Sequence, residues 1–324
     1  MKKALFALLA SLGCTTAVLA EPMPISAAHY RHQAGDISVT ALFDGVVYLP
    51  SKDVKNIGTG RLTQLLQQSN TPEHKEGLQT SVNAFLLERN GEKVLVDTGT
   101  ANCFASFNPT LGHVPAALRA AGVRTEDIRH VLLTHGHSDH VCGLLTNDGR
   151  PNYPNATVWL AADEAAYWQN DQEKAKTPEA FRFLFDQERA ALKPYAAAGK
   201  LRTFKAGDTL PLNARVVPTP GHTVGHTAFL LGEHSNAPLL LWGDVVHFPA
   251  VQFAVPGAAY AHDQNTNQGS RTRQHILQQA AAKHWLVAGA HLPFPGIGRV
   301  LKGSGKTEAY RWLPLEYAPQ PPAH

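Results

Sequence analysis

The feature that most constrains this chain is a six-residue run that holds three histidines and an aspartate: His135, His137, Asp139 and His140. The apolar residues 128–133 just before it are expected to form a buried strand, so the run lies on the turn after that strand. Imidazole and carboxylate groups are ligands that Zn, Mn, Co and Fe accept. The spacing excludes a helical zincin site, in which two histidines stand four residues apart around a glutamate. We therefore expect a divalent-metal site at a strand end.

Three further candidate ligands, His222, Asp244 and His291, follow later β-rich runs of the chain. Each stands just after an expected strand, as the first run does, so all seven side chains can meet at one edge of the fold. A single histidine or aspartate is usually a surface or hydrogen-bonding residue. The whole set favours a metal site, because buried donors without partners would each carry a desolvation penalty that a bound ion offsets.

Strand-like and helix-like patterns alternate along the chain and suggest two similar halves. Residues 37–48 and 81–97 are β-rich, and the second run folds back at Asn90-Gly91, a strong hairpin signal. This order predicts two sheets packed face to face with helices outside. The polar segment 260–270 is expected to be a surface loop. Further strands are expected at residues 157–160, 201–204, 215–217, 227–231, 239–242 and 285–288, and helices at 115–121, 162–198 and 272–283.

The ligand pattern His-x-His-x-Asp-His, followed by a separate His, Asp and His, resembles the signature of the metallo-β-lactamase-fold superfamily, and every position of that signature is filled. The resemblance implies an α/β fold, a four-layer αββα sandwich, with two divalent metal ions: Zn first, with Mn, Co or Fe as alternatives. It also implies how the ligands divide: His135, His137 and His222 for one ion, Asp139, His140 and His291 for the other, and Asp244 as the bridge.

Two ions about 3.5–4 Å apart lower the pKa of a shared water toward neutrality, so a nucleophile is available without a strong base. We expect hydrolysis of an ester-like bond, with Asp244 positioning the ions and Asp139 taking or giving a proton. His226 is expected to support the ligands from behind, and a plain strand residue is the alternative interpretation.

The segments around Asp244 and His291 resemble one branch of this superfamily in particular. Residues 242–253 and 290–296 are similar to the branch that contains methyl parathion hydrolase and exported lactonases, and the likeness extends over about residues 81–317. That branch implies small, neutral, apolar substrates: lactones, including acyl-homoserine lactones, aryl esters and, as a second activity, phosphotriesters (organophosphates). A homodimer is expected by the same analogy. The aromatic residues expected at the pocket rim, with an ordinary core face as the alternative, are Phe104, Phe107, Trp168, Phe181 and Phe185.

Four other functions share parts of this pattern. A thioester hydrolase of the glyoxalase II kind has the same ligands but needs basic residues for an anionic glutathione moiety, and no Lys/Arg cluster lies near the motifs. A β-lactamase would suit the periplasmic or secreted location that the first twenty residues indicate. A mono-iron sulfur dioxygenase needs fewer ligands than the seven donors found here. A non-catalytic metal-binding module stays open, because a fold alone does not establish activity.

The first twenty residues are typical of a cleavable secretory signal peptide: two lysines, an apolar run, and Val18-Leu19-Ala20 before Glu21. The run is too short and too interrupted for a stable membrane anchor. Cleavage after Ala20 would leave an N-terminal extension at residues 21–36 and a single hydrolase domain at 37–324. The protein is therefore expected to be periplasmic or secreted.

Removing residues 1–20 takes two lysines and no acid from a formal charge of +3, which leaves +1 and no field that attracts nucleic acid. Two cysteines remain, Cys103 and Cys142, and an oxidising compartment would allow them to pair, although the sequence alone does not decide it. Cys142 stands where the family commonly has a glycine. We interpret it as a small buried residue, with a redox-sensitive thiol as the alternative.

Overall fold

The computed structural model describes residues 28–105, 108–304 and 308–316. The expected signal peptide, residues 21–27 of the expected N-terminal extension and Phe107 lie outside these ranges. Within them, none of the helices has the length and apolar character that a membrane span requires.

The first sheet is antiparallel in its first half and parallel in its second. The hairpin between its strands at residues 77–89 and 92–96 turns at Asn90 and Gly91, whose φ angles of 52° and 81° fit the left-handed turn that this residue pair favours. From the strand at residues 92–96 onward the strands run parallel, as far as the strand at residues 201–204. In sheet order the strands are β1 (His29–Ala34), β2 (Ile37–Leu49), β5 (Gly77–Arg89), β6 (Glu92–Val96), β7 (His130–Leu132), β8 (Thr157–Ala161) and β9 (Leu201–Phe204), with β4 (Glu73–His74) also paired to β5.

The second sheet has one parallel pair, formed by residues 239–241 and 286–288, and is otherwise antiparallel. Its order is β10 (Arg215–Pro218), β11 (Thr227–Leu231), β12 (Leu239–Leu241), β14 (Leu286–Ala288), β15 (Ile297–Lys302) and β16 (Tyr310–Pro314). A separate short pair joins β3 (Val54–Lys55) to β13 (Ala259–Tyr260).

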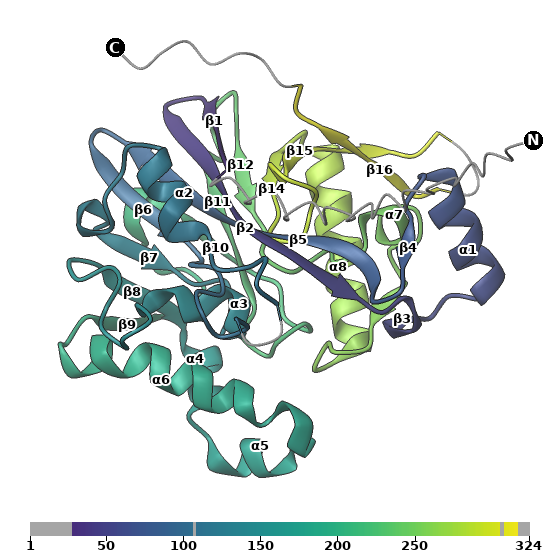
Figure 1. Cartoon of the computed structure of the whole chain (residues 1–324). Helices are drawn as coiled ribbons and strands as arrows, with labels where there is room; N and C mark the ends of the chain where they lie inside the picture. The colour runs from purple at the N-terminus through teal and green to yellow at the C-terminus, as the bar shows by residue number, and fades with distance from the viewer. Residues whose placement is uncertain (1–27, 106–107, 305–307, 317–324) are drawn as a thin grey trace, which may run out of the picture.

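Helices cover the outer face of each sheet (Figure 1). The α-helices are α1 (Thr59–Gln68), α2 (Val114–Ala120), α3 (Ser138–Val141), α4 (Ala162–Trp168), α5 (Asp171–Lys176), α6 (Phe183–Ala197), α7 (Pro249–Gln252) and α8 (Thr266–Ala282). Short 3-10 turns lie at η1 (Ser51–Asp53), η2 (Thr125–Asp127), η3 (Cys142–Leu144), η4 (Glu179–Phe181) and η5 (Pro211–Asn213).

Three apolar clusters separate the layers. Alternate residues of β5 divide between two of them: Leu87 faces the second sheet, while Leu86 packs with Leu118 of α2 and Leu192 of α6. The third cluster joins the second sheet to Leu277 of α8. Helix, sheet, sheet and helix therefore follow one another, and the expected αββα sandwich is confirmed.

Three segments differ from the sequence expectations. The helical stretch 162–198 is broken into α4, α5, η4 and α6, because Asn170 caps a new helix and Pro178 precedes another. Helix α8 starts at Thr266, not at 272, since the Asn265 side chain accepts the Gln268 N–H at 3.0 Å. The second half of the expected 260–270 loop is thus helical. Residues 29–34 of the expected N-terminal extension form β1, which pairs with β2 at the sheet edge.

The candidate ligands lie where strands of both sheets end. The run from His135 to His140 follows β7, Asp244 follows β12, and His291 follows β14. Parallel neighbours end at the same edge of a sheet, and the two sheets face each other, so these loops meet at one end of the sandwich.

Candidate metal centre

The first ligand cluster joins the turn after β7 to the loop after β10. His135 Nε2 lies 3.0 Å from His137 Nδ1, which lies 2.9 Å from His222 Nε2. Asp244 Oδ2 is 3.2 Å from His222 Nε2 and 3.6 Å from His135 Nε2. All four ligand atoms lie within 4.8 Å of one another, which is the convergence that a single ion requires.

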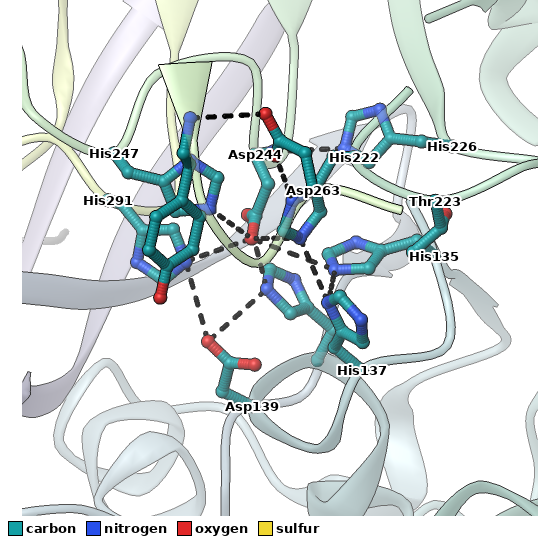
Figure 2. Close-up of polar contacts among 12 residues, drawn as sticks. His135, His137, Asp139, His222, Thr223, His226, Asp244, His247, Asp263 and His291 are labelled. Atoms are coloured by element: carbon teal, nitrogen blue, oxygen red, sulfur yellow. Dashed lines mark hydrogen bonds and ion pairs between the residues drawn. The ribbon is translucent and has the colours of Figure 1, made fainter. Parts of the chain in front are cut away.

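The second cluster shares Asp244 with the first. His140 Nε2 is 3.5 Å from Asp139 Oδ2 and 3.2 Å from Asp244 Oδ1. His291 Nε2 is 3.4 Å from Asp139 Oδ2 and 3.0 Å from Asp244 Oδ2. Figure 2 shows the two groups of side chains pointing toward one another around Asp244. The structure therefore brings all seven residues together in the two sets expected from the sequence.

These residues fit two divalent ions. Four ligands at about 2.0–2.2 Å from a tetrahedral ion stand about 3.3–3.6 Å apart. The contacts given above between ligand atoms are 2.9 to 3.6 Å long, and all atoms of a cluster lie within 4.8 Å of one another. Two of the buried ligand atoms, His140 Nε2 and Asp244 Oδ1, lie 3.2 Å apart as an ion pair but make no well-formed hydrogen bond in the described part of the chain. Such atoms carry a desolvation penalty that a cation removes.

The second ring nitrogen of several histidines is anchored, which holds the ring and leaves its other nitrogen free to bind. Two of the anchors are carboxylates that the sequence reasoning did not single out, and the third is a main-chain carbonyl. The Nδ1 contacts are His140 with Asp97 Oδ2, His222 with Asp263 Oδ1 and His291 with the Ser81 carbonyl, each at 2.9 Å.

Charge in the site depends on burial and on the carboxylates. Burial lowers the pKa of His135 and His137 well below the usual range, so these imidazoles are neutral. Burial opposes protonation of His222 too, but hydrogen bonds to Asp244 and Asp263 outweigh it and raise the pKa of His222 to about 9. Without metal, His222 is therefore protonated and carries the positive charge at this position. Metal binding has to displace it, so acid weakens metal affinity.

His226 lies against the main chain of the shared aspartate, in the supporting position expected for it. Its Nε2 accepts the Asp244 N–H at 3.0 Å, and its Nδ1 lies 2.7 Å from Thr219 Oγ1. Burial lowers the pKa of His226 to about 3, which keeps the ring neutral and able to accept at one nitrogen.

Besides Asp97, three residues of the site were not expected from the sequence: His247, Tyr260 and Asp263. His247 Nε2 is 3.2 Å from Asp244 Oδ2, and its ring centre is 4.5 Å from that of Tyr260. His247 could have been predicted as a site residue, because it stands only three residues after Asp244 in the sequence. Asp263 had no local signal, because it is one polar residue in a polar segment; it is nevertheless buried, contrary to the surface loop expected there.

A cavity of about 290 Å³ opens over both clusters. Its inner end is made by the ligands, and its walls are largely apolar. The residues that line it besides ligands are Val47, Leu49, Phe104, Ser138, Phe181, Phe183, Leu184, His247, Tyr260 and His262.

Two of the five aromatic residues expected at the rim are placed there, and two are not. Phe104 and Phe181 line the cavity. Trp168 and Phe185 are only 1% exposed and pack on each other with ring centres 4.7 Å apart, so the expectation that they line the pocket is wrong. Both belong to the buried faces of α4 and α6. Phe107 lies outside the described residues.

Cys103 and Cys142 form a disulfide bond. Cys142 is buried, as expected, but it is more than a small filler, because the bond ties the metal-ligand turn to the loop that carries Phe104. The sequence left this pairing open. The bond links two segments 39 residues apart beside the ligand cluster.

An αββα sandwich with two His/Asp clusters that share one aspartate defines the class: a protein whose clusters could hold two metal ions at the end of paired sheets. The family model described as the metallo-beta-lactamase superfamily matches residues 77–304. The chain belongs to this superfamily of metal-dependent hydrolases.

Individual relatives agree with this assignment. The probable metallo-hydrolase Mb2322c of Mycobacterium bovis is 29% identical over 247 residues, 67% of this chain and 76% of its own. The crystal structure of the hydrolase AbOPH in the beta lactamase superfamily superposes with a TM-score of 0.84 at 34% identity, over 90% of this chain and 99% of that one. AidC, a dizinc quorum-quenching lactonase in complex with a product, N-hexanoyl-L-homoserine, shares the fold at a TM-score of 0.79 and 21% identity, over 91% of this chain and 99% of its own.

Proposed function

We propose that this protein is a dinuclear-metal hydrolase of neutral, apolar lactones and aryl esters, with acyl-homoserine lactones among its substrates and neutral phosphotriesters as a second activity. The observation that carries the proposal is the lining of the cavity. Its walls are apolar and aromatic, and none of the described residues that line it is a lysine or arginine. A neutral substrate with a hydrocarbon part suits such a cavity, because burial of apolar surface supplies its affinity.

The two ions held by the clusters, most suitably Zn, would supply an activated water and polarise the scissile carbonyl or phosphoryl oxygen. Asp139 lines the cavity and is placed to exchange a proton with a bound substrate. Burial opposes its ionisation, yet His140 and His291 hold the pKa of its carboxyl well below the usual range, so it is a carboxylate. An ionised carboxylate facing the reacting centre can take the proton of the attacking water and return it to the leaving oxygen.

Tyr260 is suited to the opposite task. It lines the cavity beside His247, and burial raises the pKa of its phenol further above the usual value of 10. The phenol therefore keeps its proton at neutral pH and can donate a hydrogen bond. A hydrogen-bond donor in the cavity lining can stabilise negative charge as it develops on the substrate oxygen.

The cavity lining also disfavours the rival hydrolases. A glutathione thioester and a β-lactam both carry carboxylates, and burying a carboxylate in an apolar cavity without a cationic side chain is unfavourable. A lactone substrate is also supported by the fold that this chain shares with AidC, a lactonase.

A turnover panel on the Zn-loaded protein tests the substrate class. The panel contains an acyl-homoserine lactone, dihydrocoumarin, paraoxon, a glutathione thioester and nitrocefin. We expect kcat/KM to be highest for the two lactones and lower for paraoxon. Preference for the thioester or for nitrocefin would contradict the proposal.

We also propose that the chain is exported and cut after Ala20. The Cys103–Cys142 bond supports this, since disulfides persist in oxidising compartments. Fractionation of expressing cells, followed by N-terminal sequencing, should find the chain outside the cytoplasm with Glu21 as its first residue. A cytoplasmic chain that retains residues 1–20 would contradict export.

A further inference from the structure

Glu164, on the first turn of α4, is a fully buried carboxylate between two loops. Its Oε1 accepts the Gly136 N–H at 2.9 Å and the Trp168 indole N–H at 2.7 Å. Its Oε2 accepts the Thr223 hydroxyl at 2.7 Å and the Gly225 N–H at 2.8 Å. All four partners are donors, and an ionised carboxylate is the side chain that offers acceptors alone on both oxygens.

The two loops that meet at Glu164 carry the three histidines of the first cluster. Gly136 stands between His135 and His137, and Thr223 directly follows His222. One carboxylate oxygen therefore contacts the first loop and the other contacts the second. The separation of the loops sets the 2.9 Å distance between His137 Nδ1 and His222 Nε2.

Both loops approach α4 so closely that only glycine fits. A Cβ atom on Gly136 would lie 2.3 Å from the Trp168 indole nitrogen, and one on Gly225 would lie 2.4 Å from the Glu164 main-chain nitrogen. Real Cβ atoms do not come that near other atoms. The two glycines thus let both loops reach the same carboxylate.

We propose that Glu164 is a positioning residue for the first metal ion: it fixes the loop of His135 and His137 relative to the loop of His222. This inference rests on the two-metal site proposed above. It is specific to one ion, because the second cluster is held by other contacts, those of Asp97 with His140 and of the Ser81 carbonyl with His291. Groups that orient metal ligands typically contribute about 10–100-fold to metal affinity.

The test is a pair of matched variants, Glu164→Gln and Glu188→Gln. In the first variant the new side-chain amide would keep one acceptor and turn an NH₂ group toward the donors of the other loop. Glu188 is also fully buried, on neighbouring α6, but its contact is with Gln169 and not with a ligand loop. Zn²⁺ affinities are measured by competition with a chromophoric chelator, and Co²⁺-loaded protein gives a visible spectrum for each site.

We expect E164Q to bind one of two Zn²⁺ ions about 10–100-fold more weakly and to alter one set of Co²⁺ bands, while E188Q matches the wild type. Wild-type affinity for both ions in E164Q would overturn the inference, even if the variant melted at a lower temperature. A wild-type protein that binds fewer than two ions would instead reject the two-metal proposal.

Thr223→Val keeps the test decisive if E164Q does not fold. The change removes one donor to Glu164 and preserves the shape of the side chain. We expect a smaller loss of affinity for the same ion. Unchanged affinity for both ions in T223V, with E164Q unfolded, would also overturn the inference.

Discussion

Asp244 is the residue on which both clusters depend. It is 3% exposed and lies within 3.2 Å of His222, His140 and His291. Despite burial, the surrounding histidines hold the pKa of its carboxyl well below the usual range, so it is ionised. A buried carboxylate with this many imidazole neighbours is stable only if positive charge stands near it, as protons or as metal.

Replacement of Asp244 with alanine should remove the ligand common to both ions. We expect one ion to be lost and lactone turnover to fall about 10³-fold or more, since metal polarisation supplies several kcal/mol of transition-state stabilisation. Metal content by mass spectrometry and kcat/KM on dihydrocoumarin measure both effects. A D244A variant with unchanged turnover would reject the two-metal account.

Tyr260→Phe tests the donor proposed for the developing oxyanion. Loss of one neutral hydrogen bond of about 1–1.5 kcal/mol should lower kcat about tenfold and leave KM nearly unchanged. Tyr153→Phe is the matched control, because the Tyr153 hydroxyl is buried, has no partner among the described residues, and is absent from the cavity lining. Equal kcat values for Y260F and the wild type would remove Tyr260 from the mechanism.

At the scale of elements, the sequence predicts regular strands well. Strands β9 and β11 coincide with their expected ranges, and the Asn90-Gly91 hairpin is confirmed, because alternation and turn residues are local signals. The seven ligands could also be found, since they form a known pattern at strand ends. The early start of α8 and the division of residues 162–198 into four helices were not predicted. In both segments a helix-capping asparagine, and not the overall composition, determines where a helix begins.

The residues that support or line the site were harder to predict. Phe181 and Phe185 stand four residues apart in one aromatic segment, yet one faces the cavity and the other is buried. Helical spacing alone cannot separate these outcomes, because Phe181 ends η4 whereas Phe185 lies on α6. Glu164 and Asp263 are long-range partners of ligand loops, and no local pattern marks them.

Phe181 ends η4, forms one wall of the cavity together with the start of α6, and is 39% exposed. Phe181→Ala should raise KM for long-chain acyl-homoserine lactones about three- to tenfold with little change in kcat, because it removes apolar contact made equally in ground and transition states. The effect should shrink with a short acyl chain. Leu313→Ala, at an exposed position on β16 outside the cavity lining, is the control. A lower kcat at constant KM would contradict this role.

For the molecule as a whole, Glu188 is a buried group that makes stability depend on pH. Burial, with the nearby Glu164, raises its pKa from 4.5 to about 8. Between these values the folded protein binds more protons than the unfolded chain, so the free energy of unfolding falls as pH rises. The loss is at most about 1.4 kcal/mol per pH unit for this group and is complete above the folded pKa.

Glu188→Gln should remove that dependence. We expect the variant to be more stable than the wild type above the folded pKa of about 8 and to show a flatter profile between there and 4.5. Urea unfolding of both proteins across this range, with chelator present to exclude metal linkage, measures the difference. Parallel profiles for the two proteins would show that Glu188 does not titrate in this way.

The position of the metal ions is the most direct measurement of all. Anomalous diffraction from a crystal of the Zn-loaded protein should give two peaks on either side of Asp244, one among His135, His137 and His222, the other among Asp139, His140 and His291. A single peak, or zinc bound away from these side chains, would contradict the account.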